Sequence, residues 1–282
     1  MKNILEISHL SKDYGSFQLS DVSFAIPGGT IMGLIGENGA GNSPTIKCIL
    51  DLVHRDGGEI RFLGQDTVRR EEIGVVLDDC GYYNTFTPAQ IDRIQQGLYP
   101  RWDSALFRRY LDKFGLAGEK KPVKDFSKGM RMKLALAAAF AVRPKLLILD
   151  EATAGLDPVV RDEILDEFLE FIQDEEHGVL ISSHIPSDLE KVADYVTYLH
   201  KGRVALSGAK DELLDTYGKL VCAKADLEKV DPALLAGVRT GQFGCEALVK
   251  DRRLVSRLWP DLAVAPVSLE DIMIFTGKGD AR

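Results

Sequence analysis

The glycine-rich run Gly36-Glu37-Asn38-Gly39-Ala40-Gly41-Asn42-Ser43 is the clearest candidate for chemistry, because it separates an apolar segment, residues 31–35, from a helical pattern over residues 42–53. Glycines let the backbone curl, so that several N–H groups and the N-terminus of the next helix point at one anion. The Ser43 hydroxyl is then placed to bind Mg²⁺. This spacing favours a phosphate-binding loop, with Thr45 among its contacts, over an ordinary strand-to-helix turn.

Two residues depart from the usual loop pattern, GxxxxGK[ST]. Asn42 replaces the lysine that reaches the β- and γ-phosphates, and it carries no charge. Pro44 has no N–H to offer a phosphate and biases Ser43 away from helical dihedral angles, although a first helical turn tolerates proline. The loop is recognisable, and both changes predict weak phosphate binding.

A second motif is the apolar segment Leu146–Leu149 followed by two acids, Asp150 and Glu151. Acids at the end of a buried strand lie at the carboxyl edge of a parallel sheet, beside the phosphate loop. We expect Asp150 to hold Mg²⁺ through water and Glu151 to polarise an attacking water as general base. Acids at strand ends are common, so this motif indicates a catalytic site only in combination with the glycine loop.

The third motif is Phe126-Ser127-Lys128-Gly129-Met130, at the start of a predicted helix. Ser127 suits the N-cap position, and a merely capped helix accounts for the pattern. The alternative is a second phosphate site made by the Ser127 hydroxyl and the Gly129 N–H. The residues alone favour neither interpretation.

These motifs require strands and helices that alternate along the chain. Strand-like segments separated by helical ones predict an α/β fold with a mostly parallel sheet covered on both faces, and a helical insertion near residues 87–143. Residues 219–282 are expected to form a small C-terminal appendage with a final helix near Ser268–Phe275. The expected strands are residues 4–7, 17–26, 31–35, 60–63, 73–77, 146–149 and 179–182, and a long helix is expected over residues 158–176.

Composition narrows the class of protein. The chain has 282 residues, 45% of them hydrophobic, but its longest apolar run, residues 134–142, is shorter than the ~20 residues that a membrane span needs.

The net charge of −8 argues against a nucleic-acid partner. The basic stretch 101–133 is interpreted as a solvated helical surface, with a docking face as the alternative. Cys48, Cys80, Cys222 and Cys245 indicate reduced thiols of a cytosolic protein rather than disulfides or a metal site.

In this order, the glycine loop, FSKGM, LLILDE, Ala154-Gly155-Leu156-Asp157 and Ser182-Ser183-His184 resemble the ATP-binding cassette of ABC transporters over roughly residues 3–215. The resemblance implies a P-loop NTPase cassette with an antiparallel β subdomain, as an ABC ATP-binding domain over residues 1–218. It implies that Tyr14 stacks on adenine, that Asp157 lies at a dimer interface, and that His184 contacts the γ-phosphate and Glu151. Asp78 stands where the family has a glutamine, and it is expected to serve as a further Mg²⁺ ligand.

The resemblance also implies a function. An ATP-hydrolysing subunit of the drug, antibiotic or lantibiotic exporter type would bind ATP and Mg²⁺ between two cassettes. It would work at the cytoplasmic face of the cell membrane with a separate permease, which defines the substrate. Whether the second cassette is an identical or a related chain stays open. Two alternatives remain: a regulatory nucleotide-binding cassette with impaired hydrolysis, and a soluble ABC ATPase outside transport.

Overall fold

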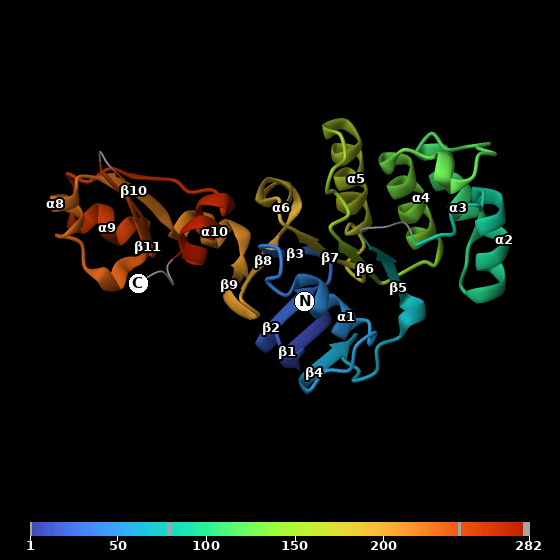
Figure 1. Ribbon diagram of the computed structural model, residues 1–282, viewed down its shortest axis with the longest axis horizontal. Coiled ribbons are helices and arrows are strands. Elements are labelled where there is room, and N and C mark those ends of the chain that lie inside the picture. Colours follow the sequence, from blue (N-terminus) through green and yellow to red (C-terminus); the bar gives the residue numbers. More distant parts are fainter. Residues whose placement is uncertain (1, 78–80, 242–243, 279–282) are drawn as a thin grey trace.

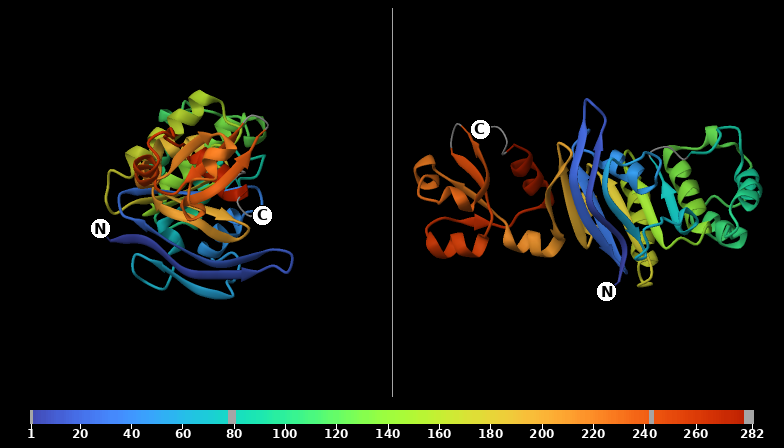
Figure 2. Two further views of the ribbon diagram at one scale, coloured as in Figure 1. Left: turned by 90° about the vertical axis from the view of Figure 1, so that its left-hand side faces the viewer. Right: turned by 90° about the horizontal axis from the view of Figure 1, so that it is seen from below.

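A six-stranded sheet forms the centre of the computed structural model, which describes residues 2–77, 81–241 and 244–278. The strand order is β5-β6-β7-β3-β8-β9; only β9 runs antiparallel to its neighbour. The sheet lies between a three-helix insertion and the C-terminal region (Figures 1 and 2). The strands are β3 (Thr30–Gly36), β5 (Ile73–Val76), β6 (Leu146–Asp150), β7 (Gly178–Ser183), β8 (Tyr195–His200) and β9 (Arg203–Ala209).

The central strands are apolar on both faces because both faces are covered. Every residue of β3, β6 and β7 is buried, as the continuous hydrophobic runs in these segments predict. In the strand order β7 lies between β6 and β3, and all three run in the same direction. The loops that leave their carboxyl ends therefore emerge at one edge of the sheet.

A second, antiparallel sheet has the order β2-β1-β4. It shares an apolar cluster with one face of the central sheet, through side chains such as Leu5, Leu19 and Ile60 on one side and Leu34 and Ile148 on the other. Its strands are β1 (Asn3–Asp13), β2 (Gln18–Pro27) and β4 (Gly57–Phe62).

Helices cover the rest of the core and build the insertion. The core helices are α1 (Asn42–Ile49), α5 (Pro158–Phe171), α6 (Pro186–Val192) and α7 (Lys210–Thr216). The insertion holds α2 (Pro88–Leu98), α3 (Ser104–Lys113) and α4 (Lys128–Ala141), with a short 3-10 turn at Val123–Asp125; another 3-10 turn, Arg70–Glu72, directly precedes β5. Among the described residues, no helix combines the length and apolarity that crossing a membrane requires.

Two helices end earlier than the sequence pattern predicts. The helix expected over residues 42–53 stops at Ile49, because Asp51 takes a φ of 52° and its N–H turns back to the Cys48 carbonyl. The helix expected over residues 158–176 stops at Phe171. There the Asp174 carboxylate accepts the Glu176 N–H at 2.9 Å, a local turn that competes with helical hydrogen bonding.

Five of the ten Lys and Arg residues in the basic stretch 101–133 form ion pairs with described residues. These cations pair with carboxylates from the core as well as from the insertion, which fits the solvated-surface interpretation. The pairs are Arg101–Glu72, Arg108–Asp92, Lys113–Glu167, Lys113–Glu170, Lys121–Glu119 and Lys133–Glu163.

The C-terminal region forms a third, antiparallel sheet of order β11-β12-β10-β13. Register places Cys222 directly opposite Cys245, two residues far apart in sequence that are both free thiols. The strands are β10 (Gly218–Cys222), β11 (Leu235–Thr240), β12 (Cys245–Val249) and β13 (Val264–Ala265). The helices are α8 (Lys224–Leu227), α9 (Arg252–Leu258) and α10 (Leu269–Lys278), with a 3-10 turn at Pro232–Leu234.

Candidate functional site

Three of the predicted motifs meet at the carboxyl edge of the central sheet. The glycine loop leaves β3, Asp150 ends β6 and Glu151 follows it, and His184 follows β7 directly. Because β7 lies between β6 and β3, His184 emerges between the acids and the glycine loop. Binding sites of open α/β sheets occupy this edge.

The glycine loop offers unpaired backbone donors. Within the described residues, the N–H groups of Asn38, Gly39, Gly41, Asn42 and Ser43 have no acceptor. Gly39, at φ 82°, faces open space, because a Cβ there would meet nothing within 4 Å. A concave run of free amides at a helix N-terminus is a suitable cradle for phosphate groups.

Thr45 and Ser43 have different roles in this loop. The Thr45 side chain is buried and its hydroxyl donates to the Gly41 carbonyl over 2.8 Å, so it supports the loop from inside. Ser43 is half-buried, and its hydroxyl bonds to none of the described residues. Ser43 therefore keeps an oxygen free for a hard cation, whereas Thr45 does not.

Asn42 turns away from the cradle. Its side chain is 8% exposed and its Nδ2 lies 3.5 Å from the Leu34 carbonyl oxygen, while Oδ1 is buried without a partner among the described residues. Pro44 lies within the first turn of α1, so Ser43 is helical despite the proline that follows it. The side chain at position 42 supplies neither charge nor reach toward a phosphate.

Ser182 links the two acids of β6. Its hydroxyl donates to Oδ1 of Asp150 over 2.5 Å and accepts the Glu151 N–H over 3.1 Å. Glu151 takes a φ of 55°, a backbone conformation that is unfavourable for a residue with a side chain. The hydrogen bond from its N–H to the Ser182 hydroxyl stabilises this conformation. Sequence reasoning did not assign this role to Ser182, and the motif Ser182-Ser183-His184 was its only local signal.

Glu151 and His184 form a close pair. Oε2 of Glu151 lies 2.5 Å from Nδ1 of His184. Burial raises the pKa of Glu151, and the hydrogen bond from His184 opposes that rise. An ionised carboxylate only accepts, so Nδ1 carries the hydrogen and Nε2 is left for another partner.

Tyr14 lies at the exposed end of β1–β2. Its side chain is 42% exposed, and its ring centroid lies 6.4 Å from that of Phe17. Phe17 lies against the loop, because a Cβ on Gly41 would lie 3.2 Å from its Cζ. The contact of Tyr14 with adenine stays a prediction, and Phe17, which carries no motif of its own, lies beside Tyr14.

Ser127, Gly129 and Asp157 gather at a different place. Ser127 caps α4 by accepting the Met130 N–H at 3.2 Å, and Asp157 caps α5 by accepting the Val160 N–H at 3.0 Å. A Cβ on Gly129 would lie 3.4 Å from Val160, which places the two helix starts side by side. No hydrogen bond or ion pair between described residues joins this cluster to the glycine loop.

Known proteins with the same arrangement are ATP-binding cassettes. The sequence profile of the family described as ABC transporter matches residues 19–154. The lantibiotic transport ATP-binding protein SrtF of Streptococcus pyogenes is 36% identical over 212 residues, covering 74% of this chain and 92% of SrtF. The chain belongs to the ABC transporter family. It is an ATP-binding subunit of that family, as the motifs predicted.

Two further comparisons support the cassette fold. A solved ATP-binding subunit of an ABC transporter superposes with a TM-score of 0.66 at 30% identity, covering 74% of this chain and 91% of that one. The ABC transporter ATP-binding protein YtrB of Bacillus subtilis is 28% identical to this chain, and the match covers 98% of this chain and 99% of YtrB. The predicted fold class, an α/β cassette with a mostly parallel sheet, is confirmed.

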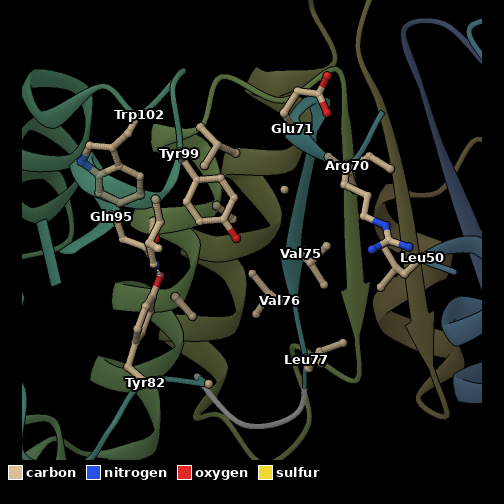
Figure 3. Close-up of a pocket in the computed structure, with 18 of the residues that line it drawn as sticks. Leu50, Arg70, Glu71, Val75, Val76, Leu77, Tyr82, Gln95, Tyr99 and Trp102 are labelled. Carbon is tan, nitrogen blue, oxygen red and sulfur yellow. Dashed lines mark hydrogen bonds between the residues drawn. The ribbon is translucent and has the colours of Figure 1, made fainter. Parts of the chain in front are cut away.

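A groove of about 600 Å³ separates the core of the cassette from its helical insertion. Figure 3 shows Val75, Val76 and Leu77 on one side and Tyr99 and Trp102 on the other. Gln95 closes one end by donating to the Tyr82 hydroxyl at 3.1 Å. The predicted Mg²⁺ ligand Asp78 lies outside the described residues, directly after Leu77.

Proposed function

We propose that this cassette hydrolyses ATP to drive export through a separate membrane permease. The observation that carries the proposal is the Glu151–His184 pair, 2.5 Å between Oε2 and Nδ1, at the sheet edge that also holds the free amides of the glycine loop. A base and its hydrogen-bond partner beside a phosphate cradle are the parts that phosphoryl transfer to water requires.

Each residue has one task in this mechanism. The loop amides and the N-terminus of α1 hold the phosphates, and Tyr14 offers its exposed ring to the adenine. Glu151 accepts a proton from the attacking water. His184 holds the Glu151 carboxylate through Nδ1 and presents Nε2 to the γ-phosphate.

Ser43 and Asp150 are the proposed Mg²⁺ ligands, with Asp78 as a third candidate. Hydroxyl and carboxylate oxygens are the donors that this hard cation prefers, and Ser43 Oγ has no competing partner among the described residues. When bound, Mg²⁺ would supply Lewis-acid stabilisation of charge on the phosphate oxygens. Ser182 keeps Asp150 oriented toward this edge.

A second cassette completes the ATP site in this proposal. Ser127, Gly129 and Asp157 form one exposed or half-buried cluster without a bond to the glycine loop of the same chain. ATP held in one cassette would be covered by that cluster of another, an identical chain or a related one. Hydrolysis would release the two.

The groove of Figure 3 is the proposed docking site of the permease. Four of the apolar side chains that line it, Leu52, Leu77, Leu98 and Tyr99, are between 41% and 67% exposed. An exposed apolar lining of this kind suits a partner helix. The cassette would thus be held at the cytoplasmic face of the membrane by its partner.

Residues 1–218 would act as the ATP-binding domain and residues 219–282 as an accessory region. SrtF is named for lantibiotic transport, and we propose export as the direction of transport. A regulatory cassette that binds nucleotide with little hydrolysis is the second candidate. It is favoured by one observation, the inward orientation of Asn42.

ATP turnover in membranes with and without the co-expressed permease tests the proposal. The chain, its N42K/P44T variant and the E151Q variant of that background should be compared. Permease-stimulated turnover that E151Q abolishes supports the exporter. Nucleotide binding without turnover in the chain that keeps Asn42 would identify the regulatory cassette instead, and turnover indifferent to the permease would indicate an ATPase outside transport.

A further inference from the structure

The last turn of α10 lies against the start of the glycine loop. A Cβ atom at Gly277 would lie 2.8 Å from the Tyr198 hydroxyl and 3.1 Å from Oε1 of Glu37. The distance to the buried Tyr198 is shorter than real Cβ contacts, so the helix backbone approaches β8 as closely as only glycine allows. The second distance is to the end of the exposed Glu37 side chain, so the C-terminal region also contacts a residue of the glycine loop.

Glu37 is a sensitive point of contact. Its carbonyl oxygen accepts the Ala40 N–H over 2.9 Å and so closes the first turn of the loop. The Tyr198 hydroxyl is buried without a hydrogen-bond partner among the described residues. Burial, with the charge of Glu37 nearby, raises the pKa of Tyr198 to about 12. Tyr198 pairs with Ile35 of β3, so displacing its buried side chain would disturb the strand that leads into the glycine loop.

Helix α10 is fixed firmly enough to transmit such a contact. Leu269, Ile272 and Phe275 are at most 2% exposed and belong to the same apolar cluster as Leu189 of α6. The Leu269 N–H donates to Oε2 of Glu190, also in α6, over 3.0 Å. Because α6 begins two residues after His184, the helix contacts the elements on both sides of the proposed γ-phosphate position.

We infer that α10 is a positioning element of the ATP site and that Gly277 is its point of contact with the glycine loop. The inference rests on the proposed function. The accessory region then sets the geometry of the loop amides through Tyr198 and its pairing with Ile35 of β3, and a side chain at position 277 weakens nucleotide binding. Gly277 touches no reacting atom and is a positioning residue.

Gly277→Ala is the direct test, made in the N42K/P44T background so that ATP binding is strong enough to titrate. Alanine favours an isolated helix over glycine by about 1 kcal/mol, so helix propensity alone predicts a neutral or stabilising change. We expect instead a three- to tenfold rise in the Kd for a fluorescent ATP analogue. Adding Tyr198→Phe removes the hydroxyl at 2.8 Å and should recover part of that loss.

Gly97→Ala in α2 is the matched control, because a Cβ there would meet nothing within 4 Å. It should leave the Kd unchanged. A G277A protein that binds ATP like its parent overturns the inference, as does a loss that Y198F fails to reduce. If the N42K/P44T parent itself binds no ATP, the proposed function has failed and the inference falls with it.

Hydrogen exchange supplies a measurement that needs no substitution at Gly277. Adding ATP to the N42K/P44T chain should slow amide exchange in α10 as well as in the loop, and leave α9 unchanged. Unaltered exchange in α10, with protection in the loop, would overturn the inference.

Discussion

Arg161 of α5 donates from Nη1 to Oδ1 of Asp188 in α6 over 3.5 Å, and from Nη2 to the Leu156 carbonyl oxygen over 3.3 Å. The Asp188 side chain is only 7% exposed. The pair thus joins the loop that carries Asp157 to the helix that follows His184. The ion pair therefore connects the region proposed to contact a second cassette with the region proposed to contact the γ-phosphate.

Removing the cation of this pair should be costly. Arg161→Met leaves a buried carboxylate unpaired, and we expect the free energy of unfolding to fall by about 3 kcal/mol. Adding Asp188→Asn should recover part of that loss, since no unpaired charge then remains. Arg93→Met, at an exposed position, is the control for thermal melting. Equal melting temperatures for R161M and R93M would show that the pair contributes nothing.

Restoring the family residues of the glycine loop should restore activity. The lysine contact is worth about 1.5–3 kcal/mol in binding, and a missing donor at developing charge typically costs about 10²–10³ in rate. We therefore expect N42K/P44T to bind ATP at least tenfold more tightly and to turn it over about a hundredfold faster than the chain as it stands.

The single variants N42K and P44T separate charge from the backbone donor, and N42Q is the uncharged control. A gain in turnover below about tenfold for N42K/P44T would mean that the loop is not the limiting defect. Another group would then have taken over the task of the lysine.

ATP should join two cassettes when hydrolysis is blocked. Glu151→Gln in the N42K/P44T background removes the base and keeps the nucleotide contacts, so light scattering after size exclusion should show a dimer with ATP and Mg²⁺. Ser127→Asp is the sharp control, because aspartate keeps the N-cap of α4 and brings a negative charge to the proposed phosphate contact. A dimer that persists with S127D would place the interface elsewhere.

Local patterns predicted the cassette because its motifs are local. The glycine loop, the acids after β6 and His184 after β7 each follow a strand, and parallel strands bring their ends together. The bond from Ser182 to Asp150 escaped prediction because it depends on the pairing of β6 with β7. The contact of Gly277 with Glu37 has no local signal at all, since it joins residues that lie far apart in the sequence.

The dependence of stability on pH should reveal how α10 is anchored. Burial acts to raise the pKa of Asp271, but hydrogen bonds from Ser268 and the ion pair with Lys219 overcome it and lower that pKa below its ordinary value of 3.8. A lowered pKa stabilises the fold above the ordinary value, and this contribution is lost as pH falls through the lowered one.

Asp271→Asn should therefore reduce the melting temperature at pH 7, by roughly 2–4 °C for a cap worth about 1 kcal/mol. The difference from the parent should shrink as pH falls below about 4. Asp166→Asn, at an exposed position of α5, should leave melting nearly unchanged. A D271N deficit that is the same at pH 7 and well below pH 3.8 would exclude the charge of Asp271 as its cause.

The docking groove can be tested without touching the ATP site. Leu98 is 67% exposed at the end of α2 and lines the groove. A glutamate there would have to bury its charge against an apolar partner helix, which is unfavourable by several kcal/mol unless the charge is paired. We expect Leu98→Glu to keep its ATP affinity and melting temperature but to lose most of its membrane association with the co-expressed permease.

Leu258→Glu in α9, where the native side chain is 53% exposed, is the matched control and should fractionate like the parent. Equal membrane association of L98E and L258E would contradict docking in this groove, and membrane association of the parent without any permease would indicate direct contact with lipid.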